Sequence, residues 1–158
     1  MTQKRKTMTD VATMYGLLTI PVKVRLVAAI AATDFEIVLF TAAPFISDAS
    51  NGSDALEYAR SGLYTVKKVL WVPDTTQAGA TATKSTYTVK KYDAAGANGV
   101  TVATFDGITG ADLTAFVQKD FGALTNATLK SGESLTLAKT HTSTGTATPA
   151  GLIIVDVV

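Results

Sequence analysis

The chain contains no cysteine and a single histidine, His141. Without cysteine it can form neither a disulfide framework nor a thiolate metal site. A histidine that acts as a general base needs a nucleophile and an orienting group within reach. Thr140, Thr142 and Ser143 are its neighbours in sequence, but successive side chains of an extended chain point to opposite sides. We therefore interpret His141 as a surface loop residue.

Charge is also scarce: charged residues make up 17% of the chain, and the net charge is +1. Nucleic-acid binding normally needs a concentrated basic surface, so no nucleic-acid partner is expected. The carboxylates are scattered singly, without the spacing of a calcium loop, and the glycines match no phosphate-binding motif. We predict no catalytic residues, no metal and no cofactor, and hence a protein that is not an enzyme.

The most apolar early stretch, residues 17–32, is too short and too charged to cross a membrane. A spanning helix needs about 20 apolar residues, and Lys23 and Arg25 interrupt this one. Apolar residues alternate with these two charges between positions 22 and 26, which is the pattern of a half-buried strand. We therefore predict a strand and no membrane partner.

What the chain has in abundance is threonine together with other residues that suit strands. Thr, Val, Tyr and Phe fit a pleated sheet, and 47% of the residues are hydrophobic, enough for a core. Regular short strands with turn signals between them predict a jelly-roll-like antiparallel β-sandwich with at most one or two short helices. Strands are predicted at 22–26 and 35–40 as a hairpin, at 63–72 as a central strand, at 85–92, at 100–105, and twice within 129–158. A short helix is predicted at 53–60, and residues 109–121 suit either a helix or a bulged strand.

Residues 129–158 are predicted to form the closing hairpin of the fold, and the final strand is apolar on both faces. Leu152 and Ile154 share one face, while Ile153, Val155 and Val157 share the other. A sandwich strand normally has one wet face, so we expect strands from 17–40 or a neighbouring subunit to cover this one. A locally thick core beneath a loop is the alternative. The candidate interface comprises Leu152, Ile153, Ile154, Val155 and Val157, together with the basic residues Lys4, Arg5 and Lys6.

The chain divides into an amino-terminal arm, residues 1–16, and one sandwich domain, residues 17–158. Residues 17–60 form a candidate attachment subregion within that domain. The arm is either a solvated tail or a segment that lies on a partner.

Four aromatic residues fall in the predicted strands: Tyr64, Trp71, Tyr87 and Tyr92. They suit either a core or an exposed platform on which a sugar stacks.

From about residue 63 to 158 the chain resembles the capsid decoration (cement) proteins of tailed bacteriophages. Three places carry the resemblance: Tyr-Thr-Val-Lys-Lys-Val-Leu-Trp-Val-Pro at 64–73, Tyr-Thr-Val-Lys-Lys-Tyr-Asp-Ala-Ala-Gly at 87–96, and Leu-Lys-Ser-Gly-Glu-Ser-Leu-Thr-Leu at 129–137. The second is followed by Val-Thr-Val-Ala at 100–103, and the third runs through Gly145 and Pro-Ala-Gly at 149–151 into the final strand.

The resemblance implies a structural virion protein on the capsid exterior, often a homotrimer, that binds the major capsid protein and stabilises the shell. Phage tail, fibre and head-fibre modules that recognise a host surface or glycan share these patterns and form the alternative.

Overall fold

The computed structural model describes residues 20–42 and 63–158, and every regular element within these ranges is a β-strand. The strands are β1 (Ile20–Leu26), β2 (Phe35–Thr41), β3 (Leu63–Pro73), β4 (Ser85–Tyr92), β5 (Val100–Asp106), β6 (Lys119–Asp120), β7 (Thr128–Lys130), β8 (Ser134–His141) and β9 (Gly151–Val157). The all-β prediction is confirmed. The helix predicted at 53–60 lies outside the described residues, as does the arm at 1–16.

The helix predicted as one alternative for 109–121 is wrong, because this stretch forms turns that end in the two-residue strand β6. Leu113 and Phe121 are buried, as the supposed apolar face requires, but Phe116 is 78% exposed and Val117 is 55% exposed. Phe116 also has a left-handed φ of 60°, which a right-handed helix cannot accommodate. The helical spacing of the apolar residues is therefore coincidental.

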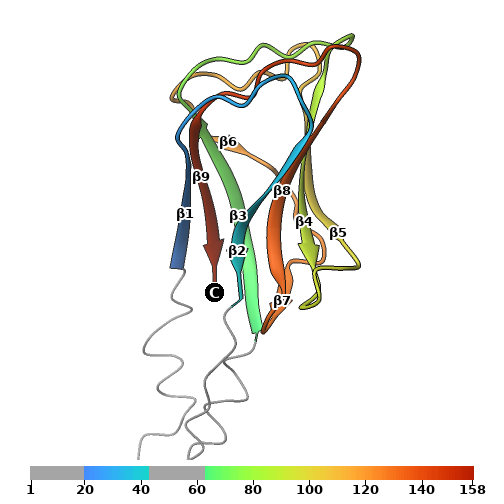
Figure 1. Ribbon diagram of the computed structural model, residues 1–158. Helices are drawn as coiled ribbons and strands as arrows, with labels where there is room; N and C mark the ends of the chain where they lie inside the picture. The colour runs from blue at the N-terminus through green and yellow to red at the C-terminus, as the bar shows by residue number, and fades with distance from the viewer. Residues whose placement is uncertain (1–19, 43–62) are drawn as a thin grey trace, which may run out of the picture.

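The strands form two antiparallel sheets that face each other (Figure 1). Sheet I has the order β1-β9-β3-β6, with β7 also pairing with β3, and sheet II has the order β2-β8-β4-β5. The partners are nested along the chain: β4 pairs with β5, β3 with β6, β2 with β8 and β1 with β9. This arrangement is a long hairpin wrapped on itself, which is the jelly-roll sandwich that the sequence predicts.

Two predicted hairpins are wrong. β1 and β2 lie in different sheets, because residues 27–34 cross from one sheet to the other. β8 and β9 are separated in the same way by residues 142–150. As a result β9 is a central strand that pairs with β3 on one side and with β1 on the other. The early strand predicted at 22–26, which is β1, therefore covers the outer edge of β9.

The core lies between the sheets and receives alternate side chains from each strand. In β9 the inward residues Ile153 and Val155 are fully buried, while Leu152 and Ile154 on the other face are half-buried. A chain of aromatic rings crosses the core, with 4.9 Å between the ring centroids of Trp71 and Tyr87. This alternation explains why the sandwich closes with one continuous apolar layer.

The antiparallel order gives the sandwich two different ends. Four connections, residues 27–34, 74–84, 107–118 and 142–150, gather at what we call the loop end, at the top of Figure 1. At the opposite end, which we call the terminal end, β1 begins, β2 ends, β3 begins and β9 ends. Segments 1–19 and 43–62 therefore join the sandwich at the terminal end. In the described ranges there is no helix long and apolar enough to cross a membrane.

Candidate functional site at the loop end

Backbone hydrogen bonds hold the four loops of the loop end together in pairs. Ile30 and Thr148 exchange N–H···O=C bonds of 3.0 and 2.9 Å, which join segment 27–34 to segment 142–150. Gln77 and Leu113 do the same at 2.8 and 3.0 Å, which joins segment 74–84 to segment 107–118. The loops therefore have the fixed positions that a binding surface requires.

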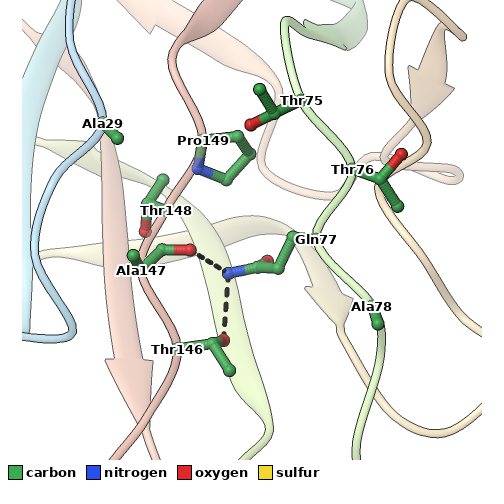
Figure 2. Close-up of a pocket in the computed structure, with 9 residues that line it drawn as sticks. All are labelled: Ala29, Thr75, Thr76, Gln77, Ala78, Thr146, Ala147, Thr148 and Pro149. Atoms are coloured by element: carbon green, nitrogen blue, oxygen red, sulfur yellow. Dashed lines mark hydrogen bonds between the residues drawn. The ribbon is translucent and has the colours of Figure 1, made fainter.

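A hollow of about 340 Å³ opens between these loops (Figure 2). Its volume is at the lower end of the range of small-molecule sites, roughly 300–1,000 Å³. None of its lining residues is charged: they are Ala29, Thr75, Thr76, Gln77, Ala78, Thr146, Ala147, Thr148 and Pro149. Hydroxyl, amide and small apolar groups of this kind suit a neutral, polar ligand better than an ion.

Gln77 bridges the hollow, and Figure 2 shows its side chain reaching from one loop to the other. Its Nε2 donates to the carbonyl oxygen of Ala147 at 2.6 Å and to Oγ1 of Thr146 at 3.0 Å. Its Oε1 accepts a 2.8 Å hydrogen bond from the hydroxyl of Tyr87. Burial raises the pKa of Tyr87, although its hydrogen bonds with Thr148 and Gln77 partly oppose this, so the hydroxyl stays a neutral donor. The network fixes the shape of the hollow before any ligand arrives.

A second polar cluster lies at the end of β8, next to the hollow. The ammonium group of Lys139 is buried and donates to the carbonyl oxygen of Thr146. Burial lowers the pKa of Lys139, and the nearby charge of Asp34 partly opposes this. Nδ1 of His141 lies 2.5 Å from Oδ1 of Asp34, which ties β8 to segment 27–34. His141 is thus half-buried at a strand end, where it joins two elements, whereas the sequence predicts a loop position.

Among the described residues, no group of three or more His, Asp or Glu side chains is placed to hold a metal ion.

Exposed apolar side chains concentrate at the loop end. Ile108, Phe116 and Val117 are exposed on segment 107–118, and Val27 is 87% exposed on segment 27–34. Segment 107–118 is fixed beside the hollow, because the backbone N–H of Ala115 donates to the hydroxyl of Thr76 at 3.0 Å. Phe116 follows Ala115 on this segment, and its aromatic ring is exposed from a backbone conformation that costs energy to hold.

The aromatic platform proposed as one alternative from the sequence is wrong. Trp71 and Tyr87 are fully buried and pack edge to face in the core. Tyr64 and Tyr92 are half-buried, and Tyr64 packs against Phe40 at 5.4 Å between centroids. In residues 20–42 and 63–158 the exposed aromatic residue is Phe116, which was missed because its stretch was interpreted as a regular element.

The candidate interface residues divide between the two faces of β9. Ile153, Val155 and Val157 lie in the core of their own chain, so they have no surface to offer a partner. Leu152 and Ile154 lie on the outer face of sheet I and keep part of their surface exposed. Lys4, Arg5 and Lys6 lie outside the described residues.

Searches of protein-family models, of characterised proteins and of solved structures found no match for this chain.

Proposed function

We propose that the protein is a non-enzymatic structural component of a tailed-bacteriophage virion, which binds the outer surface of the capsid and stabilises it. Two things support this proposal: the resemblance of residues 63–158 to capsid decoration proteins, and the jelly-roll sandwich that this resemblance implies and that the fold has. One fold serves many functions, so the jelly-roll sandwich alone does not assign this role. The two ends of the sandwich are what favour attachment.

The observation that carries the proposal is the separation of the two ends. Segments 1–19 and 43–62 both join the sandwich at the terminal end, and the first of them contains Lys4, Arg5 and Lys6. Attachment through these segments to the major capsid protein directs the loop end away from the shell. The arm and residues 43–60 of the candidate attachment subregion, 17–60, then act from the terminal end, whereas residues 27–34 of that subregion lie at the loop end.

Such a protein needs no chemistry of its own. A molecule that binds only the assembled capsid stabilises that state in proportion to the logarithm of its concentration over Kd. Its own body must remain folded under conditions that threaten the shell, and a sandwich whose first and last strands pair with each other suits that requirement.

The test uses capsids of the encoding phage from which this protein has been removed. We expect them to disassemble at a lower temperature than complete capsids, and added protein to bind and restore their resistance. The variant K4E/R5E/K6E should bind more weakly with an unchanged melting temperature of its own, while K4R/R5K/K6R should bind normally. Capsids that neither bind the added protein nor gain resistance would refute the capsid role.

A second candidate function, recognition of a host-surface glycan, is favoured by the uncharged hollow and by the exposed ring of Phe116, whose neighbour Ala115 is hydrogen-bonded to the lining residue Thr76. Sugars offer hydroxyl groups to residues such as Thr75 and apolar ring faces to an aromatic residue. A glycan array should then show specific binding that Phe116→Ala abolishes and Val27→Ala, at another exposed apolar residue, retains. An array without specific signal eliminates this candidate.

A further inference from the structure

The outer face of sheet I carries a row of side chains with opposite charges at its two ends. Lys23 on β1 is paired with Ile154 on β9, Ile154 with Leu70 on β3, and Leu70 with Asp120 on β6. Read across the sheet, the row runs positive, apolar, apolar, negative. Leu70 is only 7% exposed but is not part of the core cluster between the sheets, as its outward direction requires.

The rows on either side continue this pattern. On one side Asp156 of β9 lies beside Lys68 of β3. On the other side Leu152 lies beside Val72, and β1 contributes Arg25. The centre of the face is therefore apolar: Val72, Leu152 and Ile154 are half-buried and keep part of their surface exposed, around Leu70, which is buried. We call these four residues the sheet I patch. A solvated outer face of an antiparallel sheet would carry polar residues at these positions.

The register makes this face complementary to itself. Consider a two-fold axis that runs parallel to the strands, lies between the two facing sheets and passes midway between β9 and β3. In the second copy this axis reverses the order of each row. Lys23 then faces Asp120 of a second copy, Ile154 faces Leu70, and Asp156 faces Lys68. We propose that two copies of this chain pair face to face about this axis, with the sheet I patches in contact. Sheets packed in this way lie about 10 Å apart with their strands roughly aligned, so facing side chains meet.

Charge excludes the other face-to-face pairing. A second two-fold axis would also lie between the two faces but would run perpendicular to the strands. It would place β1 of one copy against β1 of the other. Lys23 and Arg25 would then lie against Lys23 and Arg25 of the second copy, and like charges in contact disfavour a complex. The apolar patch supplies attraction without direction, while the charges select the orientation.

The existing ion pairs do not oppose this arrangement. Lys68 and Asp120 are 3.7 Å apart within one chain, and Arg25 and Asp74 are 2.6 Å apart; the side chains of Lys68, Asp120 and Arg25 are about half exposed, and that of Asp74 is 30% exposed. Exposed pairs contribute little to folding, so these groups are free to share partners across the interface. The axis leaves both loop ends pointing the same way, and both terminal ends likewise. The pairing does not depend on the proposed capsid role, and it differs from the homotrimer that the resemblance implies.

The test measures solution mass by sedimentation over a range of concentrations. We expect a dimer for the unchanged protein. Lys23→Glu and Asp120→Lys should each weaken dimerisation by roughly tenfold or more, because each reverses two contacts related by symmetry. The double variant K23E/D120K should recover most of that loss, and Ile154→Lys should give monomers. Lys90→Glu reverses a charge on the outer face of sheet II, and although it removes the ion pair with Glu36 within the chain, it should leave dimerisation unchanged.

A monomer or a trimer of the unchanged protein overturns the proposal. So does a double variant that dimerises no better than the single ones, since the two charges would then not face each other. Circular dichroism shows which variants remain folded. If Ile154→Lys does not fold, the exposed charge reversals still decide the question.

Discussion

Within the described part of the chain, Lys139 is the charged residue that is buried. Its side chain is 1% exposed, and its ammonium group donates to the carbonyl oxygen of Thr146. Burial lowers the pKa of Lys139 in the fold below the ordinary value of 10.5, against the opposing attraction of Asp34. The unfolded chain therefore binds more protons than the folded one as the pH rises toward 10.5, and stability increases with pH across that window.

Lys139→Met should remove this dependence while filling a similar volume. The measurement is the free energy of urea unfolding of both proteins from neutral pH up to 10.5. The unchanged protein should gain stability relative to the variant as the pH rises, because its folded state gives up the buried charge. Subtracting the unfolding free energy of the variant from that of the unchanged protein removes the contributions of the other titrating groups, which both proteins share. Parallel profiles would show that the ammonium group remains hydrated in the fold.

Phe116 holds an exposed aromatic ring at a φ of 60°, a conformation that a side chain with a Cβ adopts at a cost of about 1–2 kcal/mol. Phe116→Gly should relieve this strain and lose little packing, because the ring is 78% exposed. We expect unfolding to become harder by about 1 kcal/mol, measured by urea denaturation. Val117→Gly is the matched control: Val117 is exposed but does not have a positive φ, so this change should destabilise the protein. A destabilising Phe116→Gly would mean that the ring packs on the loop end.

Among the elements, the start of β9 lies close against the end of β3. A Cβ at Gly151 would lie 2.5 Å from the carbonyl oxygen of Val72 and 2.6 Å from Nε1 of Trp71. Gly151→Ala would force β9 away from β3, and overpacking of this kind costs about 1–3 kcal/mol. Gly122→Ala is the control, because a Cβ there meets nothing within 4 Å, although its φ of 83° brings a smaller strain. Thermal melting should show a larger loss for Gly151→Ala, and equal losses would mean that the two strands have room to separate.

Local pattern predicts the strands well and their partners poorly. The boundaries of β4 and β5 follow from alternation, and their pairing follows from their closeness in the chain, because a hairpin is a local structure. β1 pairs with β9 at the far end of the chain, and nothing near either strand specifies that partner. The predicted hairpins at 22–40 and 129–158 were wrong for this reason.

The loop-end site could not be predicted because it has no local motif. Gln77, Tyr87 and Thr148 come from three separate segments and meet only when the loops have folded together. Phe116 is likewise recognisable only from its exposed ring and its left-handed φ. The apolar character of both faces of β9 was visible in the sequence, but the sequence could not show which face would be the core.

For the whole molecule, folding and pairing are linked through β9. Its inward face, with Ile153, builds the core, while its outward face, with Ile154, builds the sheet I patch. Ile153→Ala should therefore cost about 2–5 kcal/mol of stability through a cavity and leave the surface of the folded protein unchanged. A loss of this size from Ile154→Ala in a dilute sample would contradict its outward position.

The proposed dimer also makes stability depend on concentration. If the folded chain pairs and the unfolded chain does not, then above Kd each tenfold rise in concentration stabilises a protomer by about 0.7 kcal/mol, half of the 1.4 kcal/mol that corresponds to a factor of ten. The melting temperature of the unchanged protein should rise with concentration. That of Lys23→Glu should rise only at higher concentrations, because its Kd is larger, whereas Lys90→Glu should behave like the unchanged protein. A melting temperature that is constant across the series would show that the sandwich unfolds as a single chain, and that the sheet I patch has no partner.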